Sequence, residues 1–540
     1  MDQLIRQHFP YDAFFKGQYE VIEQVVSHFR SGKKYVMAQV PTGVGKSAIA
    51  YTIHKVLKSY APKHRSTFVT VTKQLQDQYV REFADIDDLK GKTNYECLKK
   101  VGPYNSQGCR EALSTERCSR NICPYFTARE HWCNVAQLKL TNTAFMVEAC
   151  EMLVMKPENR SNLIVVDECH TLDSKLVDHC TLGVELANLQ YALKIAGSGF
   201  AEKLLKFYTA FYGSNVGDII DANSEKQHRE KVAAAKDLWL ACSSYMEEWN
   251  KIMNAGHGSG TMGAAIEEIQ QITDKLSIFW TTRAEWIVQE TVPSKKLVLK
   301  PVYASSVAEH GIFRKADQFL LMSATICGFH EFARTLGLKP DEYAIVEVPS
   351  PIPVKQRPVF ACDLIKVTGD YDSAMLVKYI DKLIKRESGN GLIHTVSYKL
   401  AQEIKDSSKF SDRMLIHRDM AQTMAALKSG DAIILSPSME QGYDFKGDLA
   451  RWQIIAKYPH DYLGDPWIKL NTERSSKWYR RRGVLRAVQA CGRAVRGVED
   501  WANTYIVDSE FTRVLKDNRD LFPEWFLESV VRRDEIPFLR

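Results

Sequence analysis

Long apolar runs, cysteines and net charge are all scarce in this sequence. No apolar run approaches the ~20 residues of a membrane-spanning helix, so we expect no membrane association. The first residues lack a basic stretch followed by an apolar one, so no secretory signal is expected, and the default location is cytoplasmic, or nuclear in a eukaryote. Only 12 of the 540 residues are cysteine, which excludes a disulfide-rich scaffold. The formal charge of +6 is too small to identify a partner.

The chain is too long for a single hydrophobic core, and its segments predict two α/β units. Apolar runs typical of buried parallel strands alternate with helical stretches such as residues 46–60. Residues 174–293 are almost wholly helical in pattern, and the Pro-rich residues 349–358 indicate a linker. The expected strands are residues 33–40, 66–72, 162–168, 318–325, 391–396, 431–437, 452–459 and 503–508.

The octapeptide VPTGVGKS (Val40–Ser47) lies between an expected strand and an expected helix. Its glycines allow backbone N–H groups to surround phosphate oxygens at a helix N-terminus. The lysine would reach the β- and γ-phosphates of ATP, and the serine would bind Mg²⁺. A chance glycine-rich turn is the alternative, and the strand–loop–helix context disfavours it. The expected nucleotide-binding residues of this loop are Thr42, Gly43, Gly45, Lys46 and Ser47.

Two adjacent acids end a later apolar strand in the segment VVDECH (Val165–His170). A nucleotide hydrolase needs an acid near Mg²⁺, here Asp167, and a carboxylate that orients the attacking water, here Glu168. A plain strand-end turn is the alternative interpretation. The position after a phosphate-binding loop favours catalysis.

The segment QACGRAVRG (Gln489–Gly497) places Arg493 and Arg496 about one helical turn apart. Paired guanidinium groups suit the charge that develops on a transferring γ-phosphoryl group. A basic surface helix is the alternative. The arginines are therefore candidate catalytic residues that a second α/β unit would supply.

In their order along the chain, these segments resemble the motifs of superfamily-2 helicases. The resemblance implies two RecA-like parallel-sheet motor domains with ATP between them, Gln18 on the adenine, and Gln489 and Asp444 coupling cleft closure to the nucleic-acid strand. Val40 and Cys169 depart from the family pattern, but neither position contacts nucleotide in that pattern. The matching segments are FKGQ (15–18), VTKQLQDQY (71–79, motif Ia), DECH (167–170), SAT (323–325, motif III), MEQGYDFKG (439–447, motif V) and QACGRAVR (489–496, motif VI).

The interruptions of the first motor domain resemble those of the XPD/DinG family of iron–sulfur helicases. LKGKTNYEC with its following cysteines resembles the insertion that holds a [4Fe–4S] cluster, and the later helical stretch resembles the Arch. The resemblance implies a monomeric motor that moves 5′→3′ on single-stranded DNA and unwinds forked duplex DNA. The expected domains are the first motor domain (1–88, 141–175 and 301–350), the iron–sulfur domain (89–140), the Arch (176–300) and the second motor domain (351–540).

Four cysteines suit a [4Fe–4S] cluster, which binds four thiolates. Structural zinc sites also take four, but usually in close C-x₂₋₄-C pairs, whereas the gaps here are eleven, eight and four residues. Absence of any metal is the third possibility. Cys133 could replace one member, although CPYF matches the family's context for the last ligand. The expected cluster ligands are Cys97, Cys109, Cys118 and Cys123.

Two other functions remain open at this point. One is a nucleic-acid clamp that ATP gates without unwinding, and the other is an RNA-directed member of the same family. The motor motifs look intact, which disfavours the clamp. The compact size suits a bacterial or viral protein.

Overall fold

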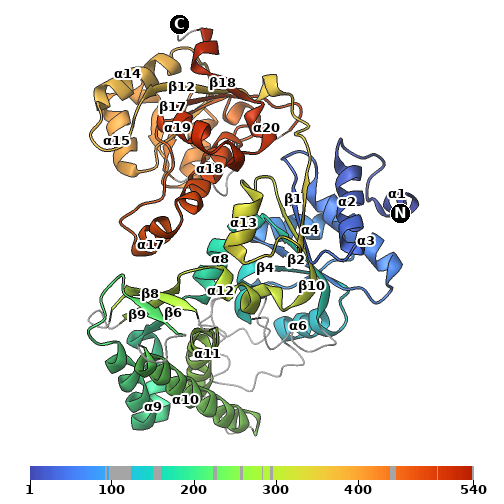
Figure 1. Cartoon of the computed structure of the whole chain (residues 1–540), viewed down its shortest axis with the longest axis vertical. Helices are drawn as coiled ribbons and strands as arrows, with labels where there is room; N and C mark the ends of the chain where they lie inside the picture. The colour runs from blue at the N-terminus through green and yellow to red at the C-terminus, as the bar shows by residue number, and fades with distance from the viewer. Residues whose placement is uncertain are drawn as a thin grey trace.

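Figure 1 shows the computed structural model of the chain, which describes residues 1–91, 94–95, 123–149, 160–222, 228–255, 260–282, 284–291, 296–437, 445–495 and 497–537. Within these ranges, no helix is both long and apolar enough to cross a membrane. Five predicted functional residues lie outside the described residues, namely Cys97, Cys109, Cys118, Asp444 and Arg496.

Two seven-stranded parallel sheets confirm the predicted pair of RecA-like α/β domains. In strand β1, Tyr35 and Met37 pack into one hydrophobic core, while Val36 and Ala38 pack into another. Both faces of the first sheet are therefore buried, which explains the continuous apolar runs of its central strands. In spatial order its strands are β11 (Tyr343–Glu347), β1 (Tyr35–Gln39), β10 (Ala316–Ser323), β5 (Ser161–Asp167), β2 (Ser66–Thr70), β4 (Leu138–Asn142) and β3 (Asp87–Asp88).

Helices of the first motor domain pack around this sheet (Figure 1). The helix that follows the phosphate-binding loop has the predicted bounds, Lys46–Tyr60. The helices are α1 (Asp2–His8), α2 (Gln18–Arg30), α3 (Lys46–Tyr60), α4 (Lys73–Glu82), α6 (Pro124–Asn134), α8 (Leu172–Cys180), α12 (Ser305–Ala308) and α13 (Phe329–Leu336).

The second motor domain repeats the parallel arrangement. In spatial order its strands are β14 (Met414–Ile416), β15 (Ile433–Ser436), β13 (Gly391–His394), β16 (Trp452–Ile455), β17 (Asn503–Asp508), β12 (Val359–Ile365) and β18 (Val530–Arg532). Its helices are α14 (Ser373–Ile384), α15 (Tyr398–Ser407), α16 (Met420–Leu427), α17 (Pro466–Arg474), α18 (Ser476–Cys491), α19 (Glu510–Asp517) and α20 (Glu524–Leu527).

The region between β5 and β10 is largely helical over residues 174–293, as the pattern predicts, but β6, β7 and β8 interrupt these helices, so the prediction was incomplete. It contains a four-stranded antiparallel sheet in the order β6-β9-β8-β7, beside three long helices. In β9, Leu297 and Leu299 are buried while their neighbours are half-exposed, as in a strand with one face against a core. The elements are β6 (Leu182–Glu185), β7 (Ile219–Asp221), β8 (Glu285–Glu290), β9 (Lys296–Pro301), α9 (Gln190–Phe211), α10 (Arg229–Asn254) and α11 (Gly260–Thr281).

Helix α17 connects the second motor domain to this inserted region. In Figure 1 it extends from the orange and red domain toward β8. The Trp467 indole N–H donates to the Pro301 carbonyl (2.9 Å), and the Arg474 guanidinium pairs with Glu285 (2.5 Å). The second motor domain therefore contacts both the first motor domain's insertion and, through α18, its catalytic edge.

A buried histidine pair in the first motor domain predicts acid sensitivity. His54 and His64 both contact the Ser66 hydroxyl, at 2.8 and 3.1 Å. Burial lowers the pKa of His54 to about 3 and that of His64 to about 4. Below pH ~6.5 the unfolded chain binds protons that the folded chain excludes, so stability falls as the pH drops toward 4.

Between pH 7.5 and pH 5, each histidine should cost about 2 kcal/mol of unfolding free energy. Denaturant unfolding at the two pH values measures this loss. A His54→Asn/His64→Asn double variant should show a smaller loss than the unmodified chain. An equal pH dependence in both proteins would contradict the assignment.

Candidate active site

The predicted catalytic residues of the first motor domain meet at the carboxyl edge of its sheet. Strands β1, β10 and β5 are direct neighbours, with Gln39 opposite Ser323 and Met322 opposite Asp167. The loop after β1 and the two acids at the end of β5 therefore lie at one edge. Because ligands of parallel α/β sheets bind at this edge, the arrangement supports the predicted nucleotide site.

The phosphate-binding loop has the backbone conformation that the sequence predicts. Gly43 and Gly45 have φ values of 89° and 82°, a left-handed region that glycine adopts without steric cost. A Cβ atom at Gly45 would lie 2.6 Å from the Gln18 Nε2 atom, so that position also needs a residue without a side chain. Val40, which differs from the family pattern, is fully buried in the hydrophobic core, away from the surface of the loop.

Glu168 lies within reach of three polar groups that the motifs supply. Its carboxylate is 3.3 Å from the Lys46 Nζ atom and accepts a hydrogen bond from the Ser323 hydroxyl (3.1 Å). The His170 Nδ1 atom lies 3.2 Å away. Burial acts to raise the pKa of Glu168, but Lys46 and His170 outweigh it and hold the pKa well below its usual range. Glu168 is therefore a carboxylate at neutral pH, as a residue that orients water requires.

The Glu168 backbone is strained, with φ at 54° and ψ at 43°. Non-glycine residues rarely adopt this left-handed conformation, and such strain persists where surrounding contacts hold it. Here the conformation turns the side chain from the end of β5 toward Lys46. The following residue, Cys169, is fully buried in the core, so its departure from the family pattern affects packing.

Asp167 is almost fully buried, with only 3% of its surface exposed. Burial, together with the charge of Glu168, raises its pKa to about 6, although Lys46 and a hydrogen bond from Tyr79 act in the opposite direction. A buried carboxylate is stabilised when a cation binds it. Asp167 is thus suited to hold Mg²⁺, which would neutralise phosphate charge when bound, and the loop motif predicts the Ser47 hydroxyl as a second ligand.

Tyr79 is a site residue that the sequence interpretation missed. It is buried in helix α4, and its hydroxyl donates to the Asp167 carboxylate at 3.0 Å. The signal was available, because Tyr79 ends the segment that matches motif Ia. Tyr79 holds the second oxygen of Asp167 while the Glu168 N–H binds the first (2.9 Å).

A Tyr79→Phe variant should need about three to ten times more Mg²⁺ for half-maximal ATP hydrolysis, because a hydrogen bond to a charged group is lost. The rate at saturating Mg²⁺ should change little. Titration of the ATPase rate with Mg²⁺ measures both quantities. Tyr51→Phe is the matched control, since it removes a 3.0 Å hydrogen bond to Asp85 on the surface of the same domain. Equal Mg²⁺ curves for both variants would contradict the role of Tyr79.

Gln18 lies against the phosphate-binding loop. Its side chain is 1% exposed, accepts a hydrogen bond from the Phe15 N–H (2.7 Å) and directs its amide toward the Gly45 carbonyl (3.5 Å). The predicted contact of Gln18 with adenine stays a prediction. The structure shows a second role, because the glutamine connects the start of α2 to the loop that holds phosphate.

The second motor domain reaches the catalytic acids through helix α18. The Gln489 Nε2 atom lies 2.6 Å from the His170 Nε2 atom, and the other ring nitrogen of His170 is 2.8 Å from the Ser323 hydroxyl. Four residues from three motifs therefore form one polar chain, Gln489–His170–Ser323–Glu168. His170 and Ser323 belong to segments that the sequence singled out, but neither was predicted as a site residue.

Arg493 lies two residues beyond the end of α18 and is half-buried. A small cavity brings this end of the helix to the phosphate-binding loop, with Pro41 and Thr42 on one side and Cys491 and Gly492 on the other. The predicted partner Arg496 is outside the described residues. The turn after α18 that carries Arg493 therefore lies beside the phosphate-binding loop, in the cleft between the two motor domains.

Of the four predicted cluster ligands, the structure describes Cys123, which is partly exposed at the start of α6. Cys133, near the other end of that helix, is 5% exposed and packs in a hydrophobic core. The two thiols are separated by ten residues, about 15 Å of helix. Among the described residues, no group of three or more histidine, cysteine or acidic side chains could hold a metal ion.

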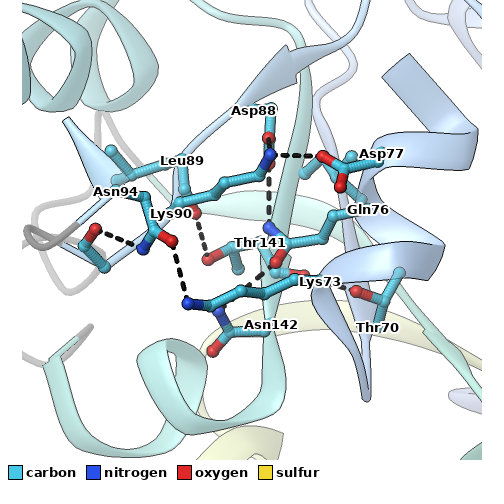
Figure 2. Close-up of polar contacts among 12 residues, drawn as sticks. Thr70, Lys73, Gln76, Asp77, Asp88, Leu89, Lys90, Asn94, Thr141 and Asn142 are labelled. Atoms are coloured by element: carbon cyan, nitrogen blue, oxygen red, sulfur yellow. Dashed lines mark hydrogen bonds and ion pairs between the residues drawn. The ribbon is translucent and has the colours of Figure 1, made fainter. Parts of the chain in front are cut away.

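A polar network lies where the chain leaves the first sheet for the cysteine segment (Figure 2). Gln76 of α4 donates to the Asp88 carboxylate at 2.8 Å, and the Lys73 Nζ atom donates to Asn94 at 2.8 Å. These bonds connect the start of the segment to the helix that carries Tyr79. Further pairs in Figure 2 are Lys90–Asp77, Lys90–Asp88, Thr141–Leu89 and Asn142–Gln76.

Two family models match parts of this chain. A family model described as "Helicase C-terminal domain" matches residues 380–529, and one described as "Type III restriction enzyme, res subunit" matches residues 13–196. No curated protein matches the sequence.

Solved structures of XPD helicases share the fold. One XPD helicase matches with a TM-score of 0.59 at 17% identity, over 97% of this chain and 100% of its own. Xpd4 from S. tokodaii matches with a TM-score of 0.57 at 13% identity, over 96% and 100%. These likenesses establish the fold, and one family model matches part of each motor domain. With the motor motifs in order, the two family-model matches indicate an ATP-dependent helicase, and its fold is similar to that of the XPD helicases.

Proposed function

We propose that this helicase moves 5′→3′ along single-stranded DNA and separates the strands of forked duplex DNA. The contact between Gln489 and His170 carries the proposal, because it connects the hydrolysis site of one motor domain to a helix of the other (2.6 Å). A motor that converts hydrolysis into strand movement needs such a connection between its two domains. The XPD-like fold and the resemblance of the motifs support the substrate and the direction.

The proposed roles follow from the motifs and, for Lys46, Glu168 and Gln489, are supported by the contacts described above. Lys46 and the loop N–H groups would hold the phosphates of ATP, and Glu168 would orient the attacking water. Arg493, together with Arg496, would stabilise the charge on the γ-phosphoryl group. Through its contact with His170, Gln489 would couple closure of the cleft to the hydrolysis site. Gln18 would contact adenine, and Ser47 and Asp167 would bind Mg²⁺. Asp444 would couple closure of the cleft to the nucleic-acid strand.

Strand separation on matched substrates tests the proposal. A duplex with a 5′ single-stranded tail, one with a 3′ tail and the RNA equivalents are each incubated with ATP while hydrolysis is followed in parallel. We expect unwinding of the 5′-tailed DNA alone. Hydrolysis without any unwinding would identify an ATP-gated clamp, unwinding of RNA alone would identify an RNA helicase, and unwinding of the 3′-tailed DNA would reverse the polarity.

We also propose that Cys97, Cys109, Cys118 and Cys123 bind a structural [4Fe–4S] cluster. The described chain stops at Tyr95 and resumes at Cys123, and the rings of Tyr95 and Tyr125 are in contact with centroids 5.5 Å apart. Each tyrosine is two residues from a candidate ligand, so the described residues at the two ends of the cysteine segment lie close together. The burial of Cys133 supports Cys123 as the fourth ligand.

Iron content distinguishes the two candidate fourth ligands. The purified chain should contain about four irons and absorb visible light. Cys123→Ala should lose the iron and the colour, whereas Cys133→Ala, on the same helix, should keep both. Loss of iron from the Cys133 variant alone would identify Cys133, and not Cys123, as the fourth ligand. A colourless, iron-free protein that still unwinds DNA would refute the cluster.

A further inference from the structure

Helix α18 contacts the first motor domain at a second point, which no motif marks. Arg481 is fully buried in the middle of the helix, eight residues and about 12 Å before Gln489. Its Nε atom donates to the Cys327 carbonyl at 2.7 Å, and its Nη2 atom donates to the Ile326 carbonyl at 2.9 Å. A side chain of the second motor domain therefore holds the backbone that directly follows motif III of the first.

The backbone that Arg481 holds is a strained turn. Cys327 has a φ of 56°, and the next residue, Gly328, has a φ of 63°. A cysteine in this left-handed region costs free energy that neighbouring contacts must offset. The Ile326 N–H is held within the first motor domain by the Gln39 side-chain oxygen at 2.8 Å. The turn is thus held from one side by the strand before the phosphate-binding loop and from the other side by Arg481.

Arg481 also faces an acid next to the catalytic edge. The guanidinium is 3.6 Å from the Asp173 carboxylate in α8, the helix that follows the DECH segment, and it stacks on the Phe332 ring at 4.7 Å. Asp173 lines a cavity of about 260 Å³ between the two motor domains and the inserted region, together with Trp478, Tyr303 and Arg334. Arg481 therefore touches both the wall of this cavity and the turn after motif III.

We infer that Arg481 is a positioning residue that couples hydrolysis to movement along the strand, an inference that rests on the proposed helicase function. Helix α18 has the arginine-bearing turn at one end, at the nucleotide cleft, and Trp478 at the other, at the cavity. Movement of the helix pulls on Ser323 through Gln489 and His170, and on Ile326 and Cys327 through Arg481. Both ends of the motif III segment therefore respond to one helix of the second motor domain.

The forked arrangement of N–H donors in the guanidinium group suits this role. Arginine presents several N–H donors in one plane and can bind two carbonyls and a carboxylate at once, whereas lysine carries a single point charge. Arg480, the preceding residue, donates to Asn518 at 3.2 Å within its own domain. It therefore offers a matched control on the same helix.

The test compares Arg481→Met, Arg481→Lys and Arg480→Met for ATP hydrolysis without DNA, hydrolysis with single-stranded DNA, and base pairs separated per ATP. Arg481→Met should keep its basal hydrolysis within a few-fold but lose about tenfold in DNA stimulation and in base pairs per ATP. Arg481→Lys should lose less, and Arg480→Met should match the unmodified chain. Thermal unfolding checks the fold, and an Arg481→Met/Asp173→Asn variant removes the buried pair together if the single variant is unstable.

The outcomes separate this inference from the proposed function. If basal and DNA-stimulated hydrolysis fall in parallel, or if neither changes, Arg481 has a structural role only and the inference fails. If the unmodified chain hydrolyses ATP but unwinds no duplex, the proposed strand-separating function fails instead. The DNA stimulation of hydrolysis then still decides the role of Arg481, because that measurement needs no strand separation.

Discussion

Replacing Lys46 with alanine is expected to lower DNA-stimulated ATP hydrolysis by about 10³-fold or more. Lys46 is the cation that the phosphate-binding loop offers to the β- and γ-phosphates, and its amino group lies 3.3 Å from the Glu168 carboxylate. The variant therefore loses a phosphate contact and frees the carboxylate that orients water. Steady-state hydrolysis and the binding of a fluorescent ATP analogue should both weaken.

Lys55→Ala is the matched control for this variant. Lys55 lies on the same helix and pairs with Asp85 near the surface, far from any predicted catalytic residue. It should keep the hydrolysis rate of the unmodified chain. Full turnover by Lys46→Ala, with an intact fold by circular dichroism, would refute the active site.

A Glu168→Gln variant should bind ATP nearly as well as the unmodified chain while hydrolysing it about 10²- to 10³-fold more slowly. Glutamine has the shape of glutamate and can still accept the hydrogen bond from Ser323, but it cannot take a proton from water. The expected signature is thus loss of turnover without loss of affinity, in contrast to Lys46→Ala. Single-turnover hydrolysis together with nucleotide binding measures the two effects separately.

Glu347→Gln serves as the control for Glu168→Gln. Glu347 ends β11 at the same sheet edge, is exposed and pairs with Gln39 at 2.5 Å, but it has no assigned chemical role. Its substitution should leave the hydrolysis rate within a few-fold. If Glu168→Gln retains turnover, another group must orient the water.

The central strands of both sheets could be predicted from the sequence, because a strand buried on both faces is a continuous apolar run. The strands at β1, β2, β5 and β10 were placed within a few residues. Peripheral strands such as β4 and β11 were missed, because their sequences, LKLTN and YAIVE, mix polar with apolar residues and lie beside an insertion and a linker. The antiparallel sheet of the inserted region was also missed, since its strands lie among long helices and pair across large separations in the sequence, as β6 does with β9.

The local part of the active site could also be predicted. A glycine-rich loop, a lysine, a serine and two acids have meaning at fixed spacing, and Lys46, Asp167 and Glu168 do meet in the structure. Tyr79 is a different case, because motif Ia marks the residue but its contact with Asp167 depends on a distance across the sheet. No spacing rule connects residues 79 and 167.

The sequence by itself determined the chemistry of this protein. Motifs of a few adjacent residues identify a nucleotide hydrolase, because phosphate and Mg²⁺ are bound by groups that lie close together along the chain. Only the tertiary structure decided how the two motor domains are connected. The contacts of Gln489 with His170 and of Arg481 with Ile326 and Cys327 join residues more than 150 positions apart. Such pairs form only when the two motor domains pack against one another through one helix, and this packing leaves no periodic pattern in the sequence.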